Sequence, residues 1–174
     1  ATLGKIDDIP IKLYEEAMKV NFYSPLKITK SLLNSMKKNN SGQLIFINSG
    51  AEKRGLPYSS VYSVGKAALS VYIESLRVEL YQYDIDVISI YPGRIKTNLM
   101  FKNKSYGNFS FYDTKKSRKP EVVADAIIRA SNNRKSYIFL SKITLIGVVA
   151  ALILPKLFDK FLKSKISKNK WNTI

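Results

Sequence analysis

The sequence predicts an α/β fold: an open, doubly wound parallel sheet with helices on both of its faces. Three short apolar runs have the composition of buried strands: Gln43–Ser49, Ile85–Pro92 and Ser136–Ser141. Segments with the apolar spacing of helices separate these runs. Strands that alternate with helices imply right-handed crossovers, which place the strands parallel to one another in a single sheet.

Three segments have the periodicity of helices that would cover this sheet. The first, Ile11–Asn40, repeats apolar residues at intervals of three and four, and we expect Pro25 to kink it. The second, Ser59–Tyr83, begins at a serine that can cap it. The third reads PEVVADAIIRASNN and begins at Pro120, a residue that favours the first helical turn. Residues 94–119, in contrast, are polar and aromatic without a regular period.

Residues 142–174 differ from residues 1–141, and we expect them to form an apolar helix with a basic tail. The run Ile143–Leu154 has twelve apolar or small residues, whereas a helix that spans a bilayer needs about 20. The tail after it mixes apolar side chains at Leu157, Phe158, Phe161 and Leu162 with lysines at 156, 160, 163, 165, 168 and 170. Two interpretations remain. The run completes the core or a dimer contact beside solvated lysines, or the segment lies on an anionic membrane.

Composition limits the classes of function. A chain of 174 residues with 45% hydrophobic and 24% charged residues fits one globular domain. Its 29 basic and 13 acidic residues give a net charge of +16. No aromatic-basic stacking module or helix-turn-helix pattern accompanies that charge, so we expect no nucleic-acid partner. Cysteine and histidine are both absent, which excludes disulfides and the commonest metal ligands, and we expect no metal.

The residues that can carry chemistry lie in the segment NSGAEKRGLPYSSVYSVGK, from Asn48 to Lys66. Ser49 follows a predicted strand, at the end of an open α/β sheet where ligands bind. Tyr62 and Lys66 open the next helix and share one face, because they are four residues apart. An ammonium group beside a phenol lowers the pKa of the phenol, so Tyr62 can act as an acid or base nearer neutral pH. The alternative is a capping serine and a tyrosine that only packs.

The segment INSGAEKRGLPYSSVYSVGKAAL resembles the catalytic segment of the short-chain dehydrogenase/reductases. Asn21, in MKVNFYSPL, matches the helix asparagine of that family, 28 residues before the serine. The loop YPGRIKT, Tyr91–Thr97, matches the family's Pro-Gly-x-Ile-x-Thr loop. The resemblance extends from about Asp8 to Tyr137 and implies a Rossmann-like fold.

The resemblance implies a role for each matched residue. Tyr62 would be the acid/base, Lys66 would modulate its pKa and bind the cofactor ribose, and Ser49 would stabilise the substrate carbonyl. Asn21 would hold the water that connects Lys66 to solvent. The cofactor would be NAD or NADP, with NADP slightly preferred. Besides Tyr62 and Lys66, its binding residues would be Pro92, Gly93, Ile95 and Thr97. Taken singly, Asn21 could instead satisfy backbone groups near Pro25, and Pro92-Gly93 could be an ordinary turn.

The family's glycine-rich phosphate loop does not occur in this sequence, because Gly4 is the only glycine before Gly42. The residue that selects NAD or NADP and the Asn-Ala-Gly strand of the family do not occur either. We therefore expect the chain to form the C-terminal half of the domain, with an incomplete sheet whose apolar edge is unpaired. We expect the isolated chain to be inactive.

The resemblance implies an NAD(P)-dependent oxidoreductase that interconverts a carbonyl and a secondary alcohol. We expect an apolar or lipid-like substrate, held by Ser49 and by a lid over Asn98–Tyr112 in which Leu99, Met100 and Phe101 face it. One alternative is an epimerase or dehydratase of the family's extended branch. Another is a non-catalytic membrane-surface or interaction fragment. We further expect a cytoplasmic protein with peripheral membrane contact, which forms a homo-oligomer when complete.

Overall fold

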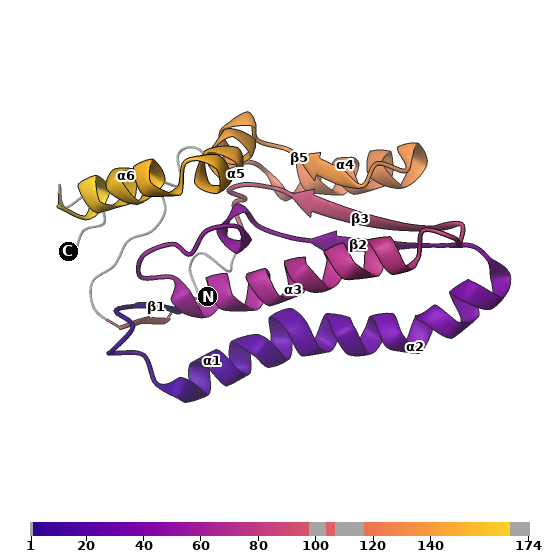
Figure 1. Ribbon diagram of the computed structural model, residues 1–174, viewed down its shortest axis with the longest axis horizontal. Helices are drawn as coiled ribbons and strands as arrows, with labels where there is room; N and C mark the ends of the chain where they lie inside the picture. Colours follow the sequence, from indigo (N-terminus) through magenta and orange to yellow (C-terminus); the bar gives the residue numbers. More distant parts are fainter. Residues whose placement is uncertain (1, 98–103, 107–116, 168–174) are drawn as a thin grey trace.

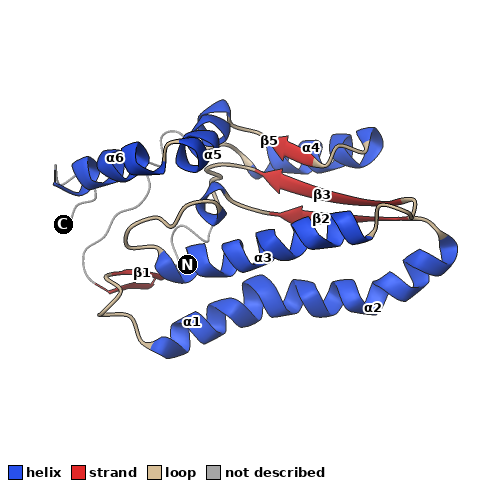
Figure 2. Cartoon of the chain, viewed as in Figure 1, coloured by secondary structure: helices blue, strands red, loops and turns tan. Residues whose placement is uncertain are grey.

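The structure is a computed structural model that describes residues 2–97, 104–106 and 117–167. Its main sheet lies between two groups of helices (Figures 1 and 2). On one side, α3 (Ser60–Glu79) packs against the sheet, with α1 (Ile11–Met18) beyond it. On the other side lie α4 (Pro120–Asn133) and α5 (Lys142–Ile153). The predicted Rossmann-like α/β fold with a parallel sheet is confirmed.

The main sheet has the strand order β2-β3-β5, and all of its strands are parallel. Its strands are β2 (Gly42–Ile47), β3 (Ile85–Tyr91) and β5 (Tyr137–Phe139). All three strands were expected, and each is shorter than its apolar run. In the part of the chain that the structure describes, β2 pairs with β3 only. Its other edge is therefore the unpaired edge that the sequence predicts.

A second, smaller sheet was not predicted. Strand β1 (Thr2–Gly4) pairs in parallel with β4 (Lys104–Tyr106), which lies within the stretch expected to be irregular. A strand of three residues is too short to show a period of two, and its partner lies about 100 residues away. Its pairing therefore depends on tertiary contacts that a single sequence does not display.

The first predicted helix is continuous but changes its pitch before Pro25. It consists of α1, a π-helical turn over Lys19–Tyr23, and α2 (Ser24–Asn39). Proline has no N–H to donate to the carbonyl four residues before it. The wider turn is consistent with this, since the Ser24 N–H bonds to the Lys19 carbonyl, five residues back. The irregularity near Pro25 is thus a π turn that ends at Tyr23, and the predicted kink at Pro25 stays a prediction.

Buried apolar residues cover both faces of the main sheet. Between the sheet and α3 lies a cluster that includes Leu44, Phe46, Leu69, Ile73 and Val87. On the opposite face, Ile88 and Ile90 pack against Ala130 of α4. Burial on this scale is the main stabilising contribution to such a fold.

Two C-terminal helices follow β5. They are α5 and α6 (Pro155–Ser167), and α5 packs against both β5 and α6. No helix within residues 2–97, 104–106 and 117–167 has the length and apolar character needed to cross a bilayer.

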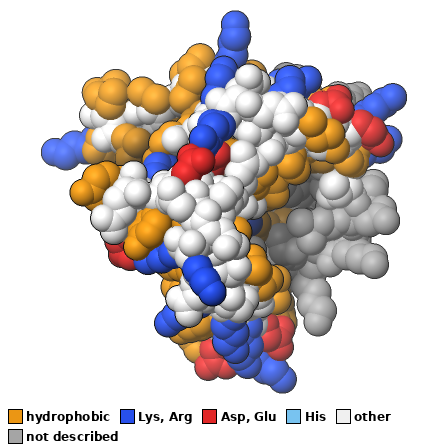
Figure 3. Space-filling view, turned by 90° about the vertical axis from the view of Figure 1, so that its right-hand side faces the viewer, with side chains coloured by type: hydrophobic (Ala, Val, Ile, Leu, Met, Phe, Trp, Pro, Cys, Tyr) orange, Lys and Arg blue, Asp and Glu red, His pale blue; other side chains and the backbone are white. Residues whose placement is uncertain are grey.

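Exposed polar contacts join the elements at the amino ends of the strands. The Arg134 Nε donates to both carboxylate oxygens of Asp86, at 3.0 and 2.8 Å, and its Nη2 pairs with Asp84. The Gln43 amide donates to Asp86 at 3.0 Å. Figure 3 views the molecule from this side, where basic and acidic side chains lie next to one another on the surface.

Candidate active site

The carboxyl ends of β2 and β3 open onto a cavity of about 260 Å³. Ser49 follows β2, Gly93 follows β3, and Tyr62 lies in the first turn of α3, and all three line this cavity. The fold therefore brings together a serine and a tyrosine that are thirteen residues apart in the sequence. The remaining lining residues are Gly50, Ala51, Arg54, Leu56, Ser59, Arg94, Thr144, Gly147, Val148, Ala151 and Phe158.

Tyr62 also lines a second cavity, which it shares with Asn21 and Ala17. Asn21 lies in the π-helical turn, and its Nδ2 donates to the Ala17 carbonyl of α1 at 3.0 Å. This bond gives Asn21 the backbone-satisfying role that the sequence left open. The role that the family resemblance implies for Asn21, holding the water between Lys66 and solvent, stays a prediction, because Lys66 does not line this cavity.

Gly65 allows the π-helical turn to approach α3 closely. A Cβ atom at Gly65 would lie 2.9 Å from the Cβ of Asn21, closer than side chains normally come. A glycine at this position therefore brings the Asn21 backbone next to the turn of α3 that carries Tyr62 and Lys66. Sequence reasoning missed Gly65, because a single helical glycine has no distinctive pattern.

Lys66 reaches across from α3 to the end of β2. Its Nζ donates to the Ile47 carbonyl at 2.8 Å, two residues before Ser49. Burial lowers the pKa of Lys66, and the negative charge of Glu52 acts in the opposite direction. The structure thus holds a cationic side chain at the strand end, one helical turn from Tyr62.

Ser49 caps the short 3₁₀ helix Gly50–Glu52. Its Oγ accepts a hydrogen bond from the Ala51 N–H at 3.2 Å. The capping role considered from the sequence is therefore present. Because the Oγ is the acceptor in this bond, its own proton is not consumed by the cap and can be donated to another oxygen.

The loop after β3 turns sharply at Gly93 and then pairs with the backbone of Arg118. Gly93 has φ of +73°, a left-handed conformation that favours glycine, and it follows the half-buried Pro92. Ile95 forms a parallel bridge with Arg118, whose carbonyl accepts from the Lys96 N–H at 2.8 Å. Beyond Lys96, Thr97 is exposed. The predicted substrate residues Leu99, Met100 and Phe101 lie outside the described residues.

Glu52 is a buried carboxylate in the short helix after Ser49, and sequence reasoning missed it. The Glu52 side chain has no exposed surface. Its Oε1 accepts from the Tyr91 hydroxyl at 2.6 Å and from the Ser70 hydroxyl at 2.8 Å, and Lys53 Nζ lies 3.8 Å away. Glu52 thereby connects the turn after Ser49 with α3 and with the end of β3.

The surroundings of Glu52 alter two pKa values. Burial raises the pKa of Glu52, although the hydrogen bonds from Tyr91 and Ser70 and the charge of Lys53 oppose this shift. The pKa of Tyr91 is raised by burial and by its hydrogen bond to Glu52. An acidic residue just after an apolar strand was the available signal, but its partner, 39 residues away, was not visible in the sequence.

Polar groups at this end of the sheet suit the nicotinamide end of a dinucleotide. The side-chain amide of Asn48, next to Ser49, is buried and has no hydrogen-bond partner among the described residues. Gly93 offers backbone without a side chain, and the Lys66 ammonium and the Ser49 hydroxyl add donors. Within the described residues, no three His, Cys, Asp or Glu side chains come together as a metal site would require.

Comparison with known sequences identifies a family. Residues 1–106 match the profile described as short chain dehydrogenase. The chain is 32% identical over 173 residues to dehydrogenase/reductase SDR family member 7B of Xenopus tropicalis, covering 96% of this chain and 56% of that protein. It is 34% identical over 171 residues to the Xenopus laevis protein of the same name, covering 95% and 53%. The chain thus spans about half the length of these curated relatives.

Solved structures show the same fold. A short-chain dehydrogenase from Streptomyces avermitilis superimposes with a TM-score of 0.73 at 22% identity, covering 98% of this chain and 68% of that one. A short-chain dehydrogenase from Burkholderia cenocepacia, solved in complex with NADP, gives a TM-score of 0.71 at 21% identity, covering 86% and 58%.

Proposed function

This chain belongs to the short-chain dehydrogenase family, and we propose that it supplies the catalytic half of an NAD(P)-dependent oxidoreductase. The reaction would interconvert a carbonyl and a secondary alcohol. One observation carries the proposal: Tyr62 lines two cavities, one shared with Ser49 and Gly93 and the other with Asn21. Tyr62 therefore contacts both the cavity that we propose for the substrate and the cavity that Asn21 lines.

In this proposal the side chains of the chain handle the proton. Tyr62 gives a proton to the substrate oxygen during reduction and takes it back during oxidation, while Ser49 donates a hydrogen bond to the same oxygen. Lys66, one turn along α3, stabilises the phenolate that remains. Asn21 holds the water that connects Lys66 to solvent, and the proton returns to Tyr62 along that relay. The nicotinamide cofactor, when bound, supplies or accepts the hydride.

The cofactor would lie against Tyr62, Lys66 and the loop after β3. In that loop Pro92, Gly93, Ile95 and Thr97 are the proposed binding residues. Support comes from the left-handed turn at Gly93 and from the backbone bonds to Arg118, which hold the loop at the strand end. The proposal places NADP slightly before NAD, and a comparison of KM for the two cofactors tests that order.

The proposed substrate is apolar or lipid-like. Val148, Ala151 and Phe158 line the same cavity as Ser49 and give one of its walls an apolar surface. Leu99, Met100 and Phe101 remain the proposed lid residues. Substitution of Leu99 or Phe101 by Ala should change KM differently for bulky and small ketones.

The proposal extends to the whole protein. We propose that the complete protein is a cytoplasmic homo-oligomer. Its cofactor half, with a glycine-rich loop, would accompany this chain, and the chain alone would be inactive. Gel filtration of the full-length protein tests the oligomer. The coding sequence upstream of Ala1 tests the cofactor half, since a region without a glycine-rich loop would contradict the proposal.

The decisive experiment replaces Tyr62 by Phe in the full-length protein. Steady-state reduction of a panel of ketones with NADPH should fall by about 10²- to 10⁴-fold, the usual contribution of a general acid. Titration of the bound NADPH by fluorescence should change little, because only one hydroxyl is lost. Tyr81→Phe, at an exposed tyrosine after α3, is the matched control and should keep full turnover. Retention of most of the turnover by Tyr62→Phe would overturn the assignment.

A further inference from the structure

Helices α5 and α6 expose an apolar surface. Helix α5 buries Val148 and Ala151, but Ile143, Ile146 and Ile153 are 82%, 66% and 70% exposed. Other exposed apolar side chains of the two helices and the residue between them are Leu145, Val149, Leu152, Leu154, Leu157 and Phe161. An apolar surface that extends over two consecutive helices is typical of a contact with a partner or a membrane.

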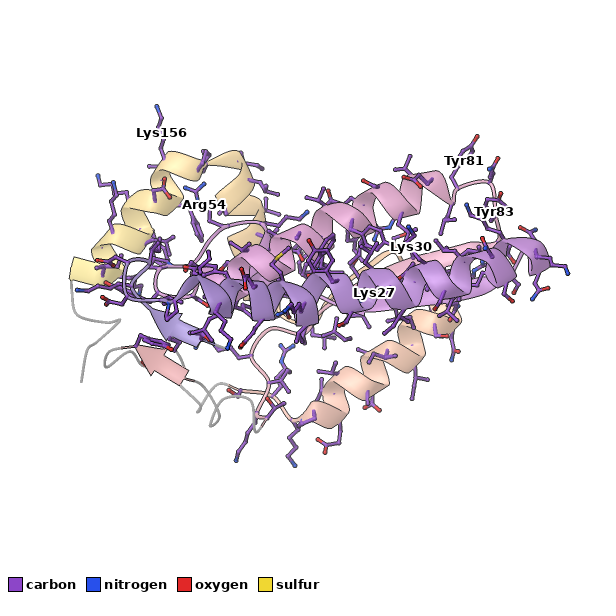
Figure 4. All side chains as sticks on the ribbon, turned by 90° about the horizontal axis from the view of Figure 1, so that it is seen from below. Lys27, Lys30, Arg54, Tyr81, Tyr83 and Lys156 are labelled. Carbon is purple, nitrogen blue, oxygen red and sulfur yellow. The ribbon has the colours of Figure 1, made fainter. Side chains whose placement is uncertain are left out.

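The charges around this surface are positive. Lysines at 142, 156, 160 and 163 are exposed, and Figure 4 shows Lys156 projecting away from the molecule. Asp159 is the only acidic residue between residues 142 and 167. It pairs with Arg54, which lies beneath α6 (Figure 4), so its charge is balanced from within the protein.

We infer that the exposed face of α5 and α6 docks on an anionic lipid surface. Apolar side chains of an interfacial helix enter the boundary of the bilayer while its lysines meet the headgroups. Lysine suits this arrangement, because its long stem can lie along apolar groups while the ammonium stays in water. On α6, the Lys165 Nζ lies 5.3 Å from the centre of the Phe161 ring, so a lysine ammonium and an aromatic side chain are neighbours on this helix.

A second copy of the chain is a less suitable occupant of this face. The buried parts of protein interfaces are depleted in lysine, because its charge is costly to remove from water. At an anionic membrane the same lysines keep their hydration and gain attraction to the lipid. The interleaving of lysine and apolar residues along α6 therefore favours lipid.

Docking through this face would link the membrane to the proposed active site. The inner side of α5 contributes Thr144, Gly147 and Val148 to the cavity that Ser49 and Tyr62 line. One helix would thus contact lipid on one side and form a cavity wall on the other. This link rests on the proposed function, whereas the docking itself does not.

Co-sedimentation of the full-length protein with vesicles tests the docking. Binding to phosphatidylcholine vesicles should increase at least tenfold when phosphatidylserine is included, and it should fall as salt is added. The variant Lys156→Glu/Lys160→Glu should lose at least tenfold in partition coefficient. Its matched control is Lys27→Glu/Lys30→Glu, which makes the same change in charge on the outer face of α2 (Figure 4). Equal losses in both variants would show a diffuse charge effect and overturn the inference.

A second pair of variants tests the apolar contribution. Ile146→Ser/Ile153→Ser should weaken vesicle binding, whereas Val71→Ser/Val78→Ser, at exposed positions of α3, should not. Thermal unfolding checks that each variant folds. If the isoleucine variant does not fold, the Lys156→Glu/Lys160→Glu variant still tests the docking.

If the isoleucine variant lowers the oligomer mass in light scattering but keeps its vesicle binding, the face belongs to a second copy. In that case, or if the unaltered protein stays in the supernatant at low salt, the inference fails. Neither result bears on Tyr62, so the two proposals fail separately.

Discussion

The two ends of the main sheet are held by the same kinds of polar group, but their exposure to water is opposite. At the amino end, Arg134 joins Asp84 and Asp86 on the surface, and its side chain is 51% exposed. At the carboxyl end, the fully buried Glu52 accepts hydrogen bonds from Tyr91 and from Ser70. Both clusters connect elements that are distant in the sequence.

The difference shows where a polar contact determines structure. Water competes with the Arg134 pairs and salt screens them, so exposed pairs of this kind contribute little to stability. Glu52 has no such competitor. Its Oε1 is matched by the hydroxyls of Tyr91 and Ser70, whereas its Oε2 is buried without a hydrogen-bond partner among the described residues. The bond to Tyr91 ties the turn after Ser49 to the end of β3, directly before Pro92. The proposed catalytic residues lie at the end where the polar contacts are buried, and substitutions there should have the larger effects.

The largest expected contrast is in turnover. Lys66→Ala in the full-length protein should lower turnover by about 10²-fold or more, because the Tyr62 phenolate loses its neighbouring cation. It should also weaken cofactor binding and raise the pH optimum. Arg134→Ala, at the other end of the sheet, should leave turnover unchanged. Steady-state kinetics across pH measures both variants, and equal losses would remove the distinction between the two ends.

The next contrast is in stability. Glu52→Ala should lower the free energy of unfolding by about 1 to 3 kcal/mol, because the Tyr91 and Ser70 hydroxyls lose a buried acceptor. Glu79→Ala, at the exposed end of α3, is the matched control and should have little effect. Urea unfolding of the full-length variants measures both. If Glu52→Ala unfolds at the same urea concentration as the unaltered protein, the buried cluster does not hold the carboxyl end together.

The same two regions explain what the sequence could predict. Strand β3 was predictable because Ile85–Tyr91 is an apolar run, and the start of α4 because Pro120 is a local signal. The approach of Ser49 to Tyr62 followed from a local motif together with the rule that ligands bind beyond parallel strand ends. Each of these predictions depends on residues that are close in the chain.

What the sequence did not predict depends on long-range contacts. The bond between Glu52 and Tyr91 joins residues 39 apart, and each of them alone is an ordinary residue of its segment. The pairing of β1 with β4 joins residues about 100 apart over three positions. The role of Gly65 is visible only once the π-helical turn is packed against α3. Such contacts result from the packing of the whole chain.

A smaller contrast concerns pH. Burial raises the pKa of Glu52 above its ordinary value of 4.5, so the folded protein binds this proton more tightly than the unfolded chain does. Ionisation of the buried Glu52 therefore destabilises the folded protein. This contribution is absent below pH 4.5, grows between pH 4.5 and the raised pKa, and is constant above it. Glu52→Gln keeps an acceptor oxygen for Tyr91 and Ser70 but cannot ionise.

The stability of Glu52→Gln relative to the unaltered protein should therefore increase as the pH rises from 4.5. The charged neighbours Lys53 and Lys66 and the hydroxyl of Tyr91 are present in both proteins, so the difference reports on Glu52. Urea unfolding at a series of pH values measures it. A difference that is constant with pH would show that Glu52 has the same pKa in the folded and unfolded states.

The smallest effect is expected at the amino end. Arg134→Ala removes the shared partner of two carboxylates, Asp84 and Asp86, both of which raise the pKa of the arginine. Even so, the Arg134 and Asp84 side chains are about half exposed, so solvent can replace that contact, and Asp86, which is 16% exposed, keeps the Gln43 amide as a donor. The loss of stability should be smaller than that of Glu52→Ala and should diminish as salt is added, because salt already weakens the pair in the unaltered protein. Parallel urea titrations at low and high salt measure this. A loss as large as that of Glu52→Ala, and independent of salt, would mean that position in the sheet, and not exposure to water, decides how strongly a polar contact holds this fold.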